Sequence, residues 1–215
     1  LNTGGTKLNA QEIRNAIYPG EFNKVIVELT RGSLFTEIFG IPPYTESNPN
    51  DYYENPDRQK NTLYASMGDC QLVLRYFALR DPGNIRGSMK SMLDRAMETR
   101  VSMSKEEAAR MKQEYVDRLT VANEIFGPQP FMLPPDEKNR VRLSAGLYDA
   151  TLVALHRLWV NRDDFIKNKA DIKRRLRSEI AHPSNGPVIT GQANTSQAVR
   201  DRITLVQRVL TGEAG

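Results

Sequence analysis

Apolar residues recur along this chain at intervals of three and four positions, which is the period of an amphipathic α-helix. No run of alternating β-branched residues competes with that period. The pattern predicts a mainly α fold, a bundle-like domain of about eight or nine helices with long proline-rich loops. The predicted helices cover residues 10–18, 22–29, 34–39, 63–79, 85–100, 104–126, 143–160, 163–181 and 196–210.

Two of the predicted helices, 63–79 and 143–160, are apolar around almost their whole circumference. A helix that is apolar on every face has to be surrounded by other elements. We therefore expect these two helices to pair at the centre of the fold, with the remaining helices packed around them.

Proline-rich stretches at 40–61 and 127–142 interrupt the helical pattern. A loop of about twenty residues is uncommon inside a compact domain and is usually either functional or mobile. For 40–61 two interpretations stay open: the segment is mobile or merely packed against a helix, or its tyrosines contact a partner. The breaks could separate subdomains, but a single helical domain over 1–215 with its core in 62–215 is simpler.

The chain opens on a tight turn that leads into the first helix. The Gly4-Gly5 pair can adopt backbone angles that are closed to other residues. Asn9 followed three positions later by Glu12 forms a capping-box pair, so the helix should begin near Ala10.

This opening segment carries a family resemblance. It reads Leu-Asn-Thr-Gly-Gly-Thr-Lys-Leu-Asn-Ala-Gln-Glu-Ile-Arg-Asn over 1–15, with Tyr-Pro-Gly-Glu-Phe-Asn at 18–23, and it resembles the GmrSD-type restriction family. Blocks at 68–79, 144–150 and 189–196 resemble later parts of that family. In the family, a ParB/sulfiredoxin-like nucleotide-handling domain with an Asp-Gly-Gln-Gln-Arg signature comes first, and helical segments follow it.

The Asp-Gly-Gln-Gln-Arg signature does not occur in the 215 residues. The resemblance therefore implies a C-terminal fragment, in which 1–40 closes the missing nucleotide-handling domain. The parent would be a cytoplasmic protein of restriction-modification and phage defence, in which hydrolysis of a nucleoside triphosphate, with a divalent metal, is coupled to action on foreign DNA.

The fragment itself is expected to be a scaffold with no cofactor and no catalysis of its own. Its expected partners are its own N-terminal domain, DNA and a second copy of the chain. The alternative is a structural, oligomerisation or protein-interaction domain with no role in nucleic-acid binding.

The net charge of +4 is modest but unevenly placed. Residues 136–215 hold 14 lysines and arginines against 9 aspartates and glutamates, whereas residues 1–135 hold 16 against 17. This asymmetry favours a phosphate-bearing partner for the last 80 residues. The single Cys70 lies in an apolar run, which predicts a buried, reduced thiol in the cytoplasm, and no apolar run is long enough to predict a membrane partner.

The opening loop is the first candidate site. Its backbone amides and one lysine precede a helix N-terminus, a combination that suits an anion such as a nucleotide phosphate. A capped turn that fixes the angle between two elements is the alternative, since the spacing of a P-loop is missing. The candidate residues are Asn2, Thr3, Gly4, Gly5, Thr6 and Lys7.

The predicted helix 163–181 is the second candidate. Its apolar stripe leaves six cations outward, and between Lys167 and Arg177 they face the single acid Asp171. Such a face could neutralise several nucleic-acid phosphates. A solvated helix face or an intramolecular contact is the alternative. The six cations are Lys167, Lys169, Lys173, Arg174, Arg175 and Arg177.

The sequence offers few histidine or cysteine residues for a metal site or a catalytic site. His156 lies in an apolar helix, and His182 with Glu179 supplies too few ligands for zinc, so we assign no metal site. No catalytic residue is assigned either. An unrecognised enzyme would need distant polar residues such as Asp69, Arg75, Asp149 and His182 to meet in one pocket.

Overall fold

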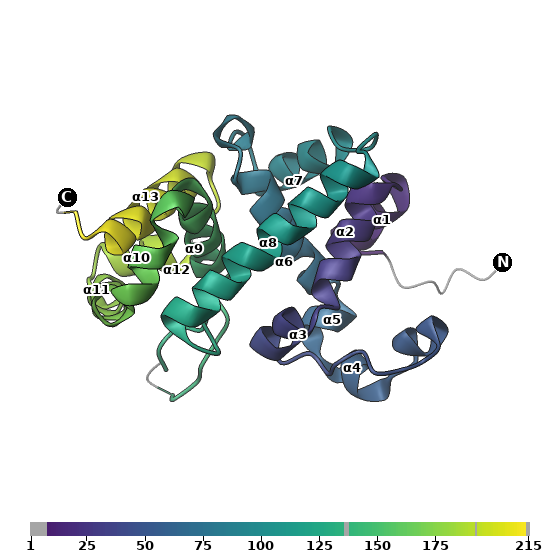
Figure 1. The fold of residues 1–215 in the computed structure, drawn as a ribbon, viewed down its shortest axis with the longest axis horizontal. Helices are drawn as coiled ribbons and strands as arrows, with labels where there is room; N and C mark the ends of the chain where they lie inside the picture. Colours follow the sequence, from purple (N-terminus) through teal and green to yellow (C-terminus); the bar gives the residue numbers. More distant parts are fainter. Residues whose placement is uncertain (1–7, 136–137, 192, 214–215) are drawn as a thin grey trace.

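The computed structural model describes residues 8–135, 138–191 and 193–213, which form thirteen α-helices and no strand (Figure 1). The mainly α class is confirmed, and the number of helices is larger than the eight or nine expected. The helices are α1 (Ala10–Ile17), α2 (Glu21–Thr30), α3 (Ser33–Phe39), α4 (Pro56–Lys60), α5 (Thr62–Ala65), α6 (Gly68–Leu79), α7 (Met89–Glu98), α8 (Lys105–Phe126), α9 (Ala145–Arg157), α10 (Arg162–Lys167), α11 (Lys169–Ala181), α12 (Asn185–Thr190) and α13 (Ser196–Thr211).

The additional helices are short. The predicted helix 63–79 is divided into α5 and α6 at Met67, whose φ is +52°. The predicted helix 163–181 is divided into α10 and α11 at Asn168. Helix α4 lies in the proline-rich stretch 40–61 and has five residues, and α12 follows Pro183 and has six. Helices of fewer than two turns hold too few apolar positions for their period to be recognised in a sequence.

The predicted capping box at the start of α1 is confirmed. The Asn9 side chain accepts hydrogen bonds from the amides of Gln11 and Glu12 at 2.9 and 3.0 Å. The Glu12 carboxylate in turn accepts from the Asn9 amide at 2.6 Å. The first turn of α1 therefore has its free amides satisfied by local side chains.

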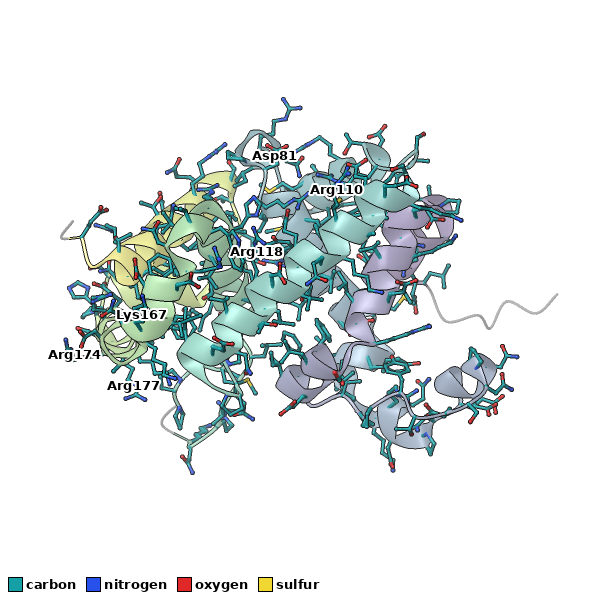
Figure 2. All side chains as sticks on the ribbon, viewed as in Figure 1. Asp81, Arg110, Arg118, Lys167, Arg174 and Arg177 are labelled. Carbon is teal, nitrogen blue, oxygen red and sulfur yellow. The ribbon has the colours of Figure 1, made fainter. Side chains whose placement is uncertain are left out.

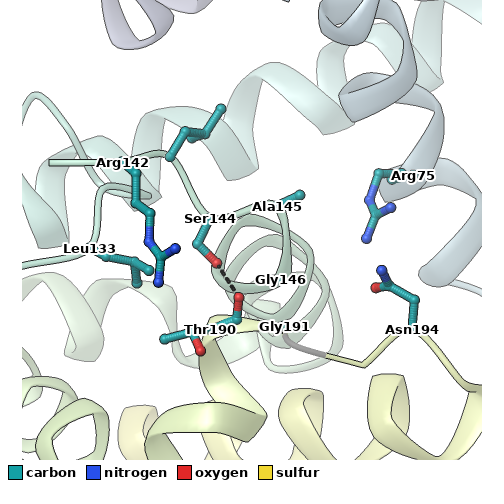
Figure 3. Close-up of a pocket in the computed structure, with 10 residues that line it drawn as sticks. Arg75, Leu133, Arg142, Ser144, Ala145, Gly146, Thr190, Gly191 and Asn194 are labelled. Carbon is teal, nitrogen blue, oxygen red and sulfur yellow. Dashed lines mark hydrogen bonds between the residues drawn. The ribbon is translucent and has the colours of Figure 1, made fainter. Parts of the chain in front are cut away.

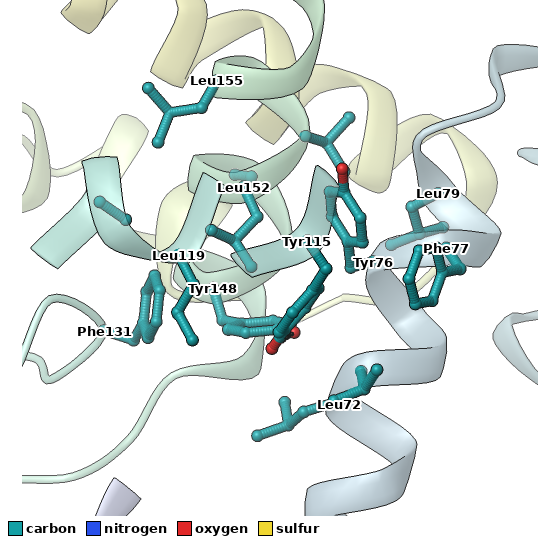
Figure 4. Packing of buried hydrophobic residues seen from close by; sticks show 14 of the residues in the cluster. Leu72, Tyr76, Phe77, Leu79, Tyr115, Leu119, Phe131, Tyr148, Leu152 and Leu155 are labelled. Atoms are coloured by element: carbon teal, nitrogen blue, oxygen red, sulfur yellow. Dashed lines mark hydrogen bonds between the residues drawn. The ribbon is translucent and has the colours of Figure 1, made fainter. Parts of the chain in front are cut away.

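The two apolar helices lie at the centre, as predicted. All residues from Leu72 to Leu79 of α6 and from Gly146 to Leu155 of α9 are buried. The long helix α8 packs against both α9 and α2 and runs between the two halves of the molecule in Figure 1. Where α6, α8 and α9 meet, the hydroxyls of Tyr115 and Tyr148 lie 2.9 Å apart in the buried core (Figure 4).

Helices α2 and α3 belong to the same core. Helix α2 packs against α6 and α8, and the ring of Phe22 meets that of Phe77 edge-on with centroids 5.5 Å apart. The cluster of buried apolar residues extends from Phe22 to Leu210. Cys70 lies within it, so the predicted burial of this thiol is confirmed.

The stretch 40–61 is folded over a buried arginine. Arg58 is completely buried, and its guanidinium donates to the carbonyls of Pro42 and Pro43 at 3.1 and 2.9 Å and to the Glu46 carboxylate at 2.6 Å. The same guanidinium lies 3.9 Å from the centroid of the Tyr44 ring. These contacts hold the segment against itself. None of the helices in the described part of the chain is long and apolar enough to cross a bilayer.

Candidate functional site

The opening loop, Asn2 to Lys7, lies outside the described residues, so the structure does not bear on the first candidate site. The second candidate lies on two helices. Five of its six cations are exposed or half-buried on the outer side of α10 and α11, and Figure 2 shows Lys167, Arg174 and Arg177 at the outer edge of the molecule.

Lys169, Lys173 and Arg177 are four residues apart from one another, so they form a row along one face of α11. Arg174 flanks this row. Its guanidinium pairs with Asp171 at 2.9 Å in an ion pair that is exposed on both sides. Lys167 pairs with Asp164 at 3.4 Å in the same way. Water and salt screen such exposed pairs, so they leave most of the positive potential of the face in place.

Arg175 points the other way. Its Nε donates to the carbonyl of Val209 at 2.7 Å and its Nη2 to the carbonyl of Leu210 at 3.2 Å. These carbonyls belong to the last turn of α13, where a cation is favoured by the negative end of the helix dipole. Arg175 therefore makes an intramolecular contact, and the outer face consists of the other five cations.

A cavity at the N-terminus of α9 was not foreseen from the sequence. It has a volume of about 260 Å³, and we call it the α9 cavity (Figure 3). The N-cap residue Ser144 accepts a hydrogen bond from the Leu147 amide at 3.0 Å and donates one to the Thr190 carbonyl at 3.0 Å. The cavity is lined by Arg75, Leu133, Arg142, Leu143, Ser144, Ala145, Gly146, Thr190, Gly191 and Asn194.

A buried cluster of two arginines and one aspartate adjoins the α9 cavity. Asp149 is completely buried and accepts two hydrogen bonds from Arg75, one from Nε at 2.9 Å and one from Nη2. Arg202 is also completely buried, with Nη1 3.9 Å from the Asp149 carboxylate and Nη2 bonded to the carbonyl of Ala193. Within the described part of the chain, Nε and Nη1 of Arg202 have no hydrogen-bond partner.

The ionisation of this cluster follows from its charges. Burial and the neighbouring Arg75 lower the pKa of Arg202, while Asp149 opposes that change. Burial alone would lower the pKa of Arg75 as well, but the charge and hydrogen bonds of Asp149 raise it above the ordinary value. Arg75 is therefore the firmly paired cation, and Arg202 is the one whose charge is incompletely balanced.

Two glycines make the geometry of the cavity possible. A Cβ atom on Gly146 would lie 2.6 Å from the Cα of Gly191 and 2.9 Å from Nη1 of Arg202. Gly191 ends α12 with a φ of +79°, a left-handed conformation that glycine adopts without strain. The first turn of α9 can therefore approach the end of α12 at backbone contact, next to the buried Arg202.

Three segments that carry the family resemblance meet at this cavity. Arg75 comes from 68–79, Gly146 and Asp149 from 144–150, and Gly191 and Asn194 from 189–196. The sequence shows these blocks as separate, and Arg75 and Asp149 are 74 positions apart. All three blocks resemble parts of the same family, and this was the only signal in the sequence that could have suggested that they lie together.

The four residues suggested for an unrecognised enzyme do not form one site. Arg75 and Asp149 form the ion pair described above. Asp69 lines a different cavity, beside Tyr44 and Cys70. His182 is exposed, and its Nδ1 accepts a hydrogen bond from the amide two residues later at 3.3 Å. The described residues hold no group of three or more histidines, cysteines or carboxylates that could bind a metal ion.

A half-buried polar cluster surrounds Glu114 on α8. Its carboxylate accepts hydrogen bonds from the hydroxyl of Tyr76 at 2.6 Å and from Arg80, and it lies 3.4 Å from Nδ1 of His156. Burial alone would raise the pKa of Glu114, but these neighbours lower it to about 2. His156 thus lies at the boundary of the core.

Searches against protein-family models, curated proteins and solved structures give no significant match to this chain. The resemblance to the GmrSD-type family therefore rests on the sequence segments quoted above.

Proposed function

We propose that this chain is the helical part of a GmrSD-type restriction protein and that the outer face of α10 and α11 binds the phosphate backbone of DNA. The observation that carries the proposal is the group of five outward cations on these two adjoining helices, of which only Lys167 and Arg174 have an acidic partner among the described residues.

The spacing of these cations suits a polyanion. Lys169 and Arg177 are eight residues apart on one helix, which corresponds to about 12 Å along its axis. Cations spaced over this length can neutralise more than one phosphate of a single strand and release the associated counterions. The face offers no aromatic platform within this row, so binding would not depend on base sequence.

In this proposal the fragment holds DNA while nucleotide hydrolysis takes place in the N-terminal domain of a cytoplasmic defence protein. The fragment itself acts as a scaffold. The alternative function, a structural or oligomerisation domain, predicts no measurable affinity for DNA.

The test compares two variants in which four cations are replaced by glutamine, with binding of a labelled DNA duplex measured by fluorescence anisotropy at fixed ionic strength. The face variant should bind at least about tenfold more weakly than the wild type, because charge-assisted contacts to phosphate are lost. The control variant has the same change in net charge and should lose much less affinity for the duplex. The face variant replaces Lys169, Lys173, Arg174 and Arg177, and the control replaces the exposed Arg86, Lys90, Lys105 and Arg110.

Equal loss in both variants would show that only net charge matters. No affinity of the wild type for DNA would leave the structural alternative. Arg175 is kept in both variants, because its replacement would remove the cap of α13 and disturb folding.

A further inference from the structure

We infer that the α9 cavity binds the phosphate group of a small molecule, either inorganic phosphate or a mononucleotide, through Arg75, Asn194 and the first amides of α9. This inference does not rest on the proposed function, because the α9 cavity shares no residue with the outer face of α10 and α11.

The charge next to the cavity is the first argument. Two completely or almost completely buried guanidiniums, Arg75 and Arg202, share a single carboxylate, Asp149. A buried charge without a full partner is costly, and a bound anion removes part of that cost. Arg142, which lines the cavity at the end opposite Arg75 in Figure 3, adds a further positive charge.

The second argument is the set of hydrogen-bond donors of Arg75 that Asp149 does not use. The side chain is 9% exposed, so it is more than nine-tenths buried, and it lines the cavity. Asp149 engages Nε and Nη2, while Nη1 makes no hydrogen bond to any residue that the structure describes. Figure 3 shows the guanidinium turned toward Asn194, on the side of the cavity opposite Arg142. Asp149 therefore holds Arg75 in place, with both hydrogens of Nη1 left for a ligand.

The third argument is the N-terminus of α9, which lies at the cavity wall. α9 has 13 residues, and its first amides have no partner within the helix. Ser144 caps the Leu147 amide, which leaves the preceding amides of Ala145 and Gly146 at the cavity. Amides at a helix N-terminus favour negative charge, and together with a fixed guanidinium they match the tetrahedral oxygens of a phosphate group.

The size of the cavity limits the ligand. A volume of about 260 Å³ lies just below the range of about 300–1,000 Å³ that is typical of sites for drug-sized ligands. It accommodates a phosphate group with part of an attached sugar. The inference is therefore confined to a single phosphate group.

The test is a titration of the isotope-labelled protein with inorganic phosphate, with chloride adjusted to hold ionic strength constant. The inference predicts saturable binding by calorimetry and concerted NMR shifts of the Ala145 and Gly146 amides. A parallel titration with a nucleoside monophosphate distinguishes the sources, since a nucleotide ligand should bind more tightly than phosphate and also shift residues near Arg142.

Two variants test the contacts. Arg75→Lys keeps a positive charge beside Asp149. Its single nitrogen has to serve both the Asp149 carboxylate and the phosphate, so phosphate affinity should fall by about 10- to 100-fold. Asn194→Ala lies in an exposed loop where folding is not at risk, and it should reduce phosphate affinity by about three- to tenfold. Arg140→Gln, in the same loop as Arg142 but outside the cavity lining, is the matched control and should bind as the wild type does.

The inference is overturned if phosphate moves the Ala145 and Gly146 amides no more than chloride does, or if Asn194→Ala and a folded Arg75→Lys bind phosphate as tightly as the wild type. The face variant of α10 and α11 should retain phosphate binding in this cavity. Loss of DNA binding and loss of phosphate binding are thus separable.

Discussion

Asp69 gives the clearest link between this structure and a measurable pH dependence. The side chain is buried at the start of α6, and burial raises its pKa from 3.8 to about 6, although the Cys70 amide, which donates to the carboxylate at 2.7 Å, opposes the rise. Tyr44, Tyr64 and Arg31 line the same cavity, and the positive charge of Arg31 lowers the pKa of Asp69 only in part.

The sign of the effect follows from proton linkage. The folded state binds the Asp69 proton more tightly than the unfolded state does, so the free energy of unfolding should fall as pH rises from about 4 to about 6, and then level off. A rise of about 2 in the pKa corresponds to about 3 kcal/mol. This is the cost of keeping the ionised carboxylate in its buried position at neutral pH.

The perturbation is Asp69→Asn, which removes the charge and keeps an oxygen that can accept from the Cys70 amide. At pH 7 the variant should be more stable than the wild type by up to about 3 kcal/mol, and the two should converge near pH 4. Urea unfolding at pH 4, 5, 6, 7 and 8 measures the difference. Asp57→Asn, at an exposed position, is the control and should change little at any of these values.

Parallel pH profiles of the wild type and Asp69→Asn would refute this reasoning. So would a variant that is less stable than the wild type at pH 7, since that result would mean that the carboxylate stabilises α6 in its ionised form.

Two further predictions concern stability. Gly146→Ala should cost at least about 1–3 kcal/mol in urea unfolding, because the new Cβ would lie 2.6 Å from the Cα of Gly191. Gly32→Ala, at an exposed position where the new Cβ makes an ordinary contact of 3.4 Å with the Leu29 carbonyl oxygen, should stay within about 0.5 kcal/mol. The pKa of Glu114 is lowered to about 2, so its contribution is complete above pH 4.5 and is lost as pH falls toward 2. Glu114→Gln should remove that acid-dependent loss, and an unchanged acid profile would contradict the assignment.

The central helices could be predicted because their sequence requires burial on every face. Residues 63–79 and 143–160 have no polar side wide enough for solvent, and α6 and α9 are indeed surrounded. The short helices could not be predicted, because α4 and α12 depend on caps and prolines rather than on periodicity. The break at Asn168 left no mark in the apolar pattern of 163–181, because the buried Phe165, Ile172 and Leu176 keep a helical spacing across it.

The candidate sites show the same limit of sequence reasoning. The outward direction of Lys173 and Arg177 follows from the apolar stripe of their helix. The inward direction of Arg175 does not, because it depends on the carbonyls of α13, more than thirty residues away. The α9 cavity requires Arg75, Gly146 and Gly191 to meet across three separate segments, and no local pattern reports such a meeting.

The salt dependence of DNA binding tests the central claim most directly. If all five outward cations of α10 and α11 contact phosphates, the logarithm of the association constant should fall against the logarithm of salt concentration with a slope of about −4.5. The face variant keeps Lys167 alone, so its slope should be about −1. The same slope in the wild type and the face variant would contradict the assignment of this face to DNA.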